Sequence, residues 1–204
     1  MDILTPLFEG KLTCLAPIDH EHDPDIVSGW THNATYLRLL DPKPARPLSP
    51  EQIKKQYQAL EKEIDEDKNL CYFAIHTRPN DQDKERLIGF AKLFWVDWTH
   101  GNSLIQIGIG DPADWNKGYG SDALSLLIRF AFSELNLFRL TARIPTYNQA
   151  ALALFRKAGF VEEVCRREAF QRDGKRWDDV HLGLLAADWQ VQHPSQPAES
   201  NTID

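Results

Sequence analysis

The chain has 204 residues, of which 42% are hydrophobic and 26% charged, and its formal net charge is -7. A chain of this length and composition buries a sizeable core, so we expect one domain over residues 1–190 and a polar, flexible tail over 191–204. The negative charge argues against non-specific nucleic-acid binding, and no stretch approaches the roughly 20 apolar residues of a membrane span.

The cysteines and the first residues predict where the protein works. Residues 1–6 have neither a basic start nor a long apolar run, so no signal peptide is expected. Cys14, Cys71 and Cys165 show no C-x-x-C spacing and each lies in an apolar run, which predicts buried free thiols. Free thiols suit a reducing compartment, and the expected location is the cytoplasm.

The first third of the chain predicts one strand and two helices. Residues 7–18 have the pattern of an opening strand, 25–33 that of a short helix, and 41–47 form a proline-rich loop. Ser49 is a helix cap with a proline at the first helical position, and apolar residues at helical spacing extend this helix to about Asp67.

Three strands are predicted next. Residues 70–76 and 87–96 are apolar runs separated by the polar segment 78–85, which indicates a hairpin. Residues 104–110 form a third, isoleucine-rich strand. This part of the chain therefore predicts sheet structure ahead of the next helix.

The last part alternates helices and strands. We expect helices over 121–135 and 150–158, a strand over 138–144, and a closing strand pair over 162–170 and 180–185. Helix 121–135 is apolar on most of its surface, as a helix packed against a sheet must be. Strands interrupted by helices predict an α/β or α+β sandwich.

The segment after the predicted strand 104–110 has the features of an anion-binding site. The strand ends at Asp111, and residues 117–121, which contain Gly118 and Gly120, follow before a helix starts. Backbone N–H groups at such a turn and the positive end of the helix bind phosphate oxygens, which predicts a cofactor with a pyrophosphate. The dinucleotide fingerprint does not fit, because position 123 is Ala, and no Gly-Lys-Ser/Thr phosphate loop occurs.

Three motifs resemble the GCN5-related N-acetyltransferases, the GNAT superfamily. Residues 115–120 are similar to the acyl-CoA loop of that family, and Asn148 opens a helix that closes at Gly159-Phe160 like its second hallmark. Residues 172–179 resemble the hairpin of the branch that acetylates ribosomal-protein N-termini. The resemblance implies a mixed, mostly antiparallel sheet of about six to seven strands flanked by about four helices.

The resemblance also implies acetyl-CoA as cofactor, with no metal. Its pantetheine would pair with the backbone of the strand ahead of the loop, with the Ile109 N–H as oxyanion donor. Because the chain is acidic, attraction for the anionic cofactor must be local, from Lys117, Arg156, Lys157 and the helix N-terminus. The residues expected at the cofactor are Gln106, Ile107, Gly108, Ile109, Gly110, Trp115, Asn116, Lys117, Gly118, Tyr119, Gly120, Ser121, Asn148, Phe155 and Lys157.

The catalytic groups are harder to predict. Many members of the family carry a Tyr general acid seven residues after the helix-opening Asn, and this chain has Phe155 there. An acceptor amine of pKa about 10.4 still needs a base or a water path. The candidates are Tyr147, Asp111, Asp179 and His181. Asp179 and His181 alternate onto one strand face, where Asp179 could orient His181 as a base, and each candidate also has a purely structural interpretation.

The expected function is N-acetyl transfer by direct attack in a ternary complex, because no cysteine or serine nucleophile setting is visible. The acceptor is a small amine or a protein N-terminus, with Asp97 and Trp98 expected at its site. The protein is expected as a monomer or homodimer without nucleic-acid or membrane partners. Because the usual Tyr is absent, an acyl-CoA-binding sensor or structural protein of the same fold is the alternative.

Overall fold

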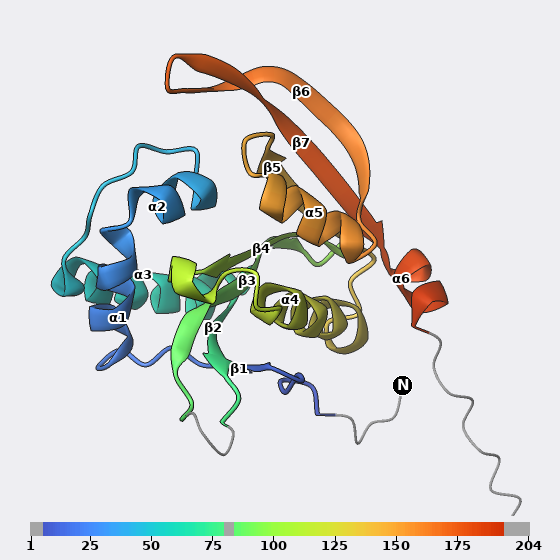
Figure 1. Cartoon of the computed structure of the whole chain (residues 1–204). Helices are drawn as coiled ribbons and strands as arrows, with labels where there is room; N and C mark the ends of the chain where they lie inside the picture. Colours follow the sequence, from blue (N-terminus) through green and yellow to red (C-terminus); the bar gives the residue numbers. More distant parts are fainter. Residues whose placement is uncertain (1–5, 80–83, 194–204) are drawn as a thin grey trace, which may run out of the picture.

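The computed structural model describes residues 6–79 and 84–193. Within them the strands pair into one sheet of seven, in the order β1-β2-β3-β4-β5-β7-β6 (Figure 1). Only β4 and β5 are parallel, so the sheet is mixed and mostly antiparallel, as predicted. The strands are β1 (Thr13–Ala16), β2 (Cys71–Thr77), β3 (Leu87–Asp97), β4 (Asn102–Ile109), β5 (Arg139–Pro145), β6 (Val161–Arg172) and β7 (Lys175–Leu185).

Six α-helices lie in the described part of the chain, two more than the four predicted. The additional ones are α2, which Asn33 caps by accepting from the Tyr36 N–H, and α6, which follows β7 directly. Of the tail expected over 191–204, the first two residues belong to α6, and 194–204 lie outside the described residues. The helices are α1 (Asp23–Thr31), α2 (Ala34–Leu40), α3 (Pro50–Asp67), α4 (Tyr119–Arg129), α5 (Gln149–Lys157) and α6 (Ala186–Gln192).

Several local predictions are confirmed and others need correction. Ser49 and Gln52 form a complete capping box at α3. The opening strand is much shorter than the predicted 7–18, because the chain before Thr13 bends and makes only an isolated bridge. The thiols are free, but none is fully buried: Cys14 and Cys71 are partly exposed, and Cys165 is exposed because β6 is an edge strand whose residues face solvent.

The main core lies between the sheet and the helices α4 and α5. Leu124 and Leu127 of α4 are fully buried there, together with Leu140 of β5 and Leu182 of β7. The opposite face of the sheet is covered by the amino-terminal helices. Tyr57 of α3, for example, packs edge-on against the Tyr72 ring of β2, with ring centroids 6.3 Å apart.

Strands β4 and β5 pair only at their beginnings. Asn102–Leu104 face Arg139–Thr141, and beyond these residues the two strands do not pair with each other. The β3–β4 ladder alternates, and the Gly110 N–H donates to the Ile88 carbonyl. The N–H and C=O groups of the intervening residues, including Ile107 and Ile109, therefore point away from β3, and the Ile109 carbonyl accepts from the Trp115 indole at 2.9 Å.

The β6–β7 hairpin reaches back to the end of α2 (Figure 1). Its turn at Asp173-Gly174 has φ values of 51° and 70°, the left-handed pair that an Asp-Gly turn adopts in a tight hairpin. Near this turn Arg172 donates to the Asp41 carbonyl at 3.1 Å, and Asp173 forms an ion pair with Arg38 of α2. The hairpin is thus longer than the predicted strand pair and borders the gap between β4 and β5.

Within these residues no helix is long and apolar enough to cross a membrane.

Candidate active site

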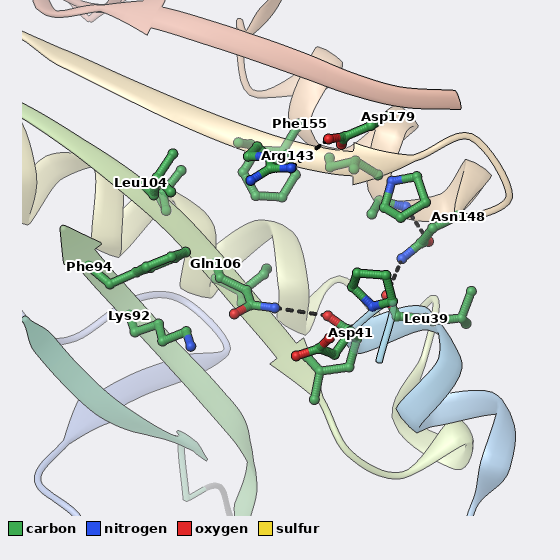
Figure 2. A pocket seen from close by; sticks show the side chains of 18 of the residues that line it. Leu39, Asp41, Lys92, Phe94, Leu104, Gln106, Arg143, Asn148, Phe155 and Asp179 are labelled. Carbon is green, nitrogen blue, oxygen red and sulfur yellow. Dashed lines mark hydrogen bonds and ion pairs between the residues drawn. The ribbon is translucent and has the colours of Figure 1, made fainter. Parts of the chain in front are cut away.

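Two cavities adjoin where β4 and β5 separate. The first, here called the loop cavity, has a volume of about 380 Å³, and most residues of the segment 115–121 line it. The second, the sheet cavity, has a volume of about 400 Å³ and lies over β3, β4, β5 and β7 (Figure 2). They share one wall, which consists of Leu39, Leu40, Ile107, Asn148, Ala151 and Phe155.

The loop cavity receives the amino terminus of α4. The first hydrogen bond of this helix runs from the Asp122 N–H to the Gly118 carbonyl, so the N–H groups of Tyr119, Gly120 and Ser121 have no acceptor within the helix. Asn116 and Gly118 take left-handed backbone conformations, with φ of 61° and 90°, which bring the chain into the helix. Free N–H groups at a positive helix end bind phosphate oxygens.

Two carboxylates near this loop are held by hydrogen bonds. Asp122 accepts from the N–H groups of Leu12 and Thr13 and from the Thr13 hydroxyl; burial acts to raise its pKa, but these hydrogen bonds prevail and lower it. Asp114 accepts two hydrogen bonds from the Arg86 guanidinium, at 2.6 and 2.7 Å, which lower the pKa of that carboxyl. The charge of Asp114 is therefore offset by Arg86 and Lys117, whereas Asp122 stays ionised with its carboxylate bound to the backbone of residues 12 and 13.

Most residues predicted to contact the cofactor line the loop cavity. They are Ile107, Gly108, Ile109, Trp115, Asn116, Gly118, Gly120, Ser121, Asn148, Phe155 and Lys157. Four others do not. Gln106 lines the sheet cavity instead, and Gly110 lies under the indole ring of Trp30, with which a Cβ would collide. Lys117 and Tyr119 line a different surface pocket, and the Lys117 ammonium lies 3.3 Å from the Asp114 carboxylate.

One face of the sheet supplies the polar groups of the sheet cavity. Lys92 is paired with Gln106, and the parallel register at Leu104 and Thr141 continues this face onto Arg143 of β5. Arg143 is next to His181 in β7, with Asp179 two residues away on the same face. The strands thus bring two basic side chains, an amide and a carboxylate to one cavity (Figure 2).

Two side-chain amides hold α2 over both cavities. Gln106 donates to the Leu40 carbonyl and Asn148 to the Leu39 carbonyl, each at 3.0 Å, and these carbonyls are at the end of α2 (Figure 2). The Asn148 side chain also accepts from the Ala151 N–H, which confirms it as the predicted cap of α5. The end of α2 is therefore fixed against β4 and α5.

Asp179 is the buried carboxylate of the sheet cavity, with 1% of its side chain exposed. Its Oδ2 accepts from Arg143 at 2.7 Å and lies 3.0 Å from His181 Nε2. Its Oδ1 is buried and has no hydrogen-bond partner among the described residues. A buried carboxylate oxygen without a donor is costly, and a donor on a bound molecule would satisfy it.

Of the predicted catalytic side chains, Asp179 lines the sheet cavity, and Tyr147, Asp111 and His181 lie outside both cavities. His181 is hydrogen-bonded to Asp179 as expected, but it sits about 6.6 Å further along β7, so Asp179 is the residue that lines the cavity. The Asp111 side chain accepts from the Ala113 N–H and caps a short 3₁₀ turn. Tyr147 packs edge-on against Trp177, and its buried hydroxyl has no described partner.

The residues expected at the acceptor, Asp97 and Trp98, also lie outside both cavities. The Asp97 carboxylate accepts from the backbone of the following turn, and the Trp98 indole donates to the Lys68 carbonyl at 2.9 Å. Trp95 lines the sheet cavity instead. The cause is an irregularity in the β3–β4 register between Phe94 and Asp97, where Trp95 has a φ of 52°.

In the part of the chain that the structure describes, no group of three or more His, Cys, Asp or Glu side chains is placed to hold a metal ion.

A sequence model described as the acetyltransferase (GNAT) domain matches residues 13–161, which is more than half of the chain. The chain belongs to the GNAT acetyltransferase family. This confirms the predicted family and enzyme class, an N-acetyltransferase, and with them acetyl-CoA as the acetyl donor. The resemblance to the ribosomal-protein branch stays a prediction.

Similar proteins carry names from several acceptor classes. The human alpha/beta-tubulin-N-acetyltransferase 9 is 27% identical over 174 residues, which are 81% of this acetyltransferase and 79% of that protein. An N-acetyltransferase 9-like protein of Nematostella vectensis is 29% identical over 133 residues, 62% of this chain and 67% of the other. The solved structure of spermidine N-acetyltransferase from Vibrio cholerae with CoA and spermine has a TM-score of 0.73 and covers 87% of this chain and 97% of that one; its 21% identity shows the fold alone.

The residues that sequence reasoning missed come mostly from α2 and from the sheet face. Leu39 and Leu40 wall both cavities, and the capping residue Asn33 was the signal for their helix. Lys92 and Arg143 belong to no motif in the sequence. Only the sheet register shows that they share a cavity.

Proposed function

We propose that this acetyltransferase moves the acetyl group of acetyl-CoA to a primary amine by direct attack within a ternary complex. The observation that carries the proposal is the shared wall of the two cavities. Ile107, Asn148 and Phe155 line both, at the point where β4 and β5 separate. A cofactor in the loop cavity and an amine in the sheet cavity would therefore meet there.

The loop cavity fits the phosphates and the pantetheine of the cofactor. The three unpaired N–H groups at the start of α4 and the Lys157 ammonium, for which no ion pair is found among the described residues, are suited to pyrophosphate. The N–H and C=O groups of Ile107 and the N–H of Ile109, which point away from β3, are suited to an extended chain with amides; the Ile109 carbonyl already accepts from the Trp115 indole. In this arrangement the Ile109 N–H acts as the oxyanion donor.

Acetyl-CoA supplies a thioester, whose carbonyl carbon forms a bond with the amine nitrogen while the carbon–sulfur bond breaks, the amine loses one proton and the thiolate gains one. Asp179 accepts an amine N–H at its unpaired Oδ1 and orients the nitrogen. Arg143 and His181 hold the other oxygen and so fix the carboxylate. The thiol of CoA has a pKa close to that of free Cys, about 8.5. The thiolate therefore leaves without a strong acid, and no proton donor is needed at the position of Phe155.

The lining of the two cavities supports direct attack. Neither a cysteine nor a serine lines the sheet cavity, and Ser121 in the loop cavity lies at the helix terminus that we assign to phosphate. A covalent acetyl-enzyme therefore has no nucleophile where the amine would bind. The names of similar proteins, which act on tubulin or on spermidine, support an amine acceptor that is either a protein or a small molecule.

The alternative is a protein that binds acyl-CoA without turnover. The observation that favours it is Phe155, which stands at the usual Tyr position and is almost fully buried beside Phe160. Initial rates of CoA release, measured while acetyl-CoA and a set of amines and N-terminal peptides are varied, separate the two. Intersecting double-reciprocal lines support the ternary complex and parallel lines refute it. Binding of acetyl-CoA without CoA release in the presence of any acceptor favours the alternative.

A further inference from the structure

Lys92 is a basic side chain of the sheet cavity that lacks a carboxylate partner. Its ammonium lies 4.8 Å from the centroid of the Phe94 ring and 5.9 Å from that of Phe90. None of the ion pairs among the described residues includes it, and burial lowers the pKa of its ammonium. An unpaired cation on an apolar, half-buried surface binds an anion well, because little water competes there.

The other charged groups of the cavity have partners. Asp179 is paired with Arg143 at 2.7 Å, and Asp41 lies 3.7 Å from the Lys43 ammonium. Counting these five lining residues, three are basic and two acidic, so the cavity carries one net positive charge. That charge is located at Lys92. A polyamine, which is cationic along its length, is poorly matched to such a cavity.

The separation of Lys92 and Asp179 determines how far apart the amine and the anionic group of an acceptor must be. The two residues lie on the same face of the sheet, in β3 and β7, with β4 and β5 between them (Figure 2). Paired strands are about 4.8 Å apart, and β4 and β5 separate beyond Leu104 and Thr141, so the two backbones are at least about 14 Å apart. Since side chains stand approximately perpendicular to a sheet, the charged groups keep a separation of this order.

An α-amino acid is too short for this distance, because its amine nitrogen and carboxylate carbon are only about 2.5 Å apart. An extended peptide rises about 3.3 Å per residue. An acidic side chain one or two residues after the amino terminus therefore reaches Lys92 while the amine is at Asp179. A small diamine has no group for Lys92.

We propose that the acceptor of this acetyltransferase is a peptide or protein amino terminus with an acidic side chain within its first residues, which Lys92 binds. The proposal rests on the function proposed above, since it assigns the amine to the sheet cavity. Lys92 is then a specificity-determining residue and takes no part in proton transfer.

The test compares three peptides that are identical except at the second residue, which is Glu, Gln or Arg. The wild-type protein should acetylate the Glu peptide with a kcat/KM about tenfold above that of the Gln peptide, which corresponds to about 1.4 kcal/mol, and the Arg peptide and spermidine should be poorer still. Lys92→Met should remove the tenfold preference, so that the Glu and Gln peptides react with similar kcat/KM values. Lys92→Arg should retain it, and Lys92→Glu should prefer the Arg peptide.

Lys55→Met is the matched control, because Lys55 is an exposed lysine of α3 outside both cavities. Calorimetry of the Glu peptide on the CoA-bound protein gives a second readout, and the affinity should fall in Lys92→Met and stay unchanged in Lys55→Met. Equal rates with the Glu and Gln peptides, or a preference for spermidine, overturn the inference and leave the proposed function intact. A loss of all turnover in Lys92→Arg with binding retained shows that Lys92 acts as a base, which also overturns it. No CoA release with any acceptor overturns both.

Discussion

Gly120 gives the sharpest test of where the cofactor binds. A Cβ built at this residue would lie 3.6 Å from a Leu154 methyl, 3.8 Å from Ile107 Cδ1 and 4.0 Å from Ile109 Cγ1. All three are ordinary van der Waals distances, so Gly120→Ala should fold normally. The same contacts show that the new methyl group points into the loop cavity, beside the free N–H groups of α4.

The magnitude follows from the hydrogen bonds that the methyl group would obstruct. A hydrogen bond to a charged group contributes about 1.5–3 kcal/mol, and the loss of one such bond weakens CoA binding about 10- to 150-fold. Gly120→Asp adds a negative charge at the same place and should reduce the affinity further. Titration calorimetry with CoA measures both changes, and thermal unfolding shows whether the fold is retained.

Gly29→Ala is the matched control, since a Cβ there has no heavy atom within 4 Å and Gly29 lies in α1. This variant should bind CoA as the wild type does. Unchanged CoA affinity in Gly120→Ala and Gly120→Asp, with both proteins folded, would refute the reasoning, because the phosphates could then not lie at the start of α4.

Three further outcomes follow from the site and its charges. Asp179→Asn should lower kcat/KM at least tenfold while CoA affinity, measured by calorimetry, stays the same. Full activity of this variant would show that Asp179 does not bind the amine. Phe155→Tyr should change turnover less than tenfold, because the leaving thiolate needs no acid, and a large gain would instead show that the natural site is impaired. The pKa of Asp114 is lower in the folded chain, chiefly through the hydrogen bonds from Arg86, so its stabilisation is present above the unfolded value and is lost as the pH falls below about 4. In urea unfolding, Asp114→Asn should accordingly have a lower midpoint at pH 7, and its midpoint should decrease less than that of the wild type as the pH falls. A decrease as steep as in the wild type would show that Asp114 is not the carboxyl responsible for the loss of stability in acid.

The elements that local interactions specify could be predicted from the sequence. Ser49 with the following proline specifies the start of α3, Asn148 and Gly159 specify the two ends of α5, and Asp173-Gly174 specifies the hairpin turn. The glycine loop before α4 was equally visible, because its conformation depends on residues adjacent in sequence. These features predicted the family, the acetyl donor and most of the residues that line the loop cavity.

The acceptor side depended on tertiary structure. Lys92, Arg143 and Asp179 are far apart in sequence, and only the register of four strands places them on one face. The same register decides that Asp179, rather than His181, lines the cavity, because a shift of two residues along β7 moves a side chain by about 6.6 Å. Residue patterns specify which way a strand's side chains alternate, but strand pairing specifies their neighbours, and the charge of the acceptor site is a property of those neighbours.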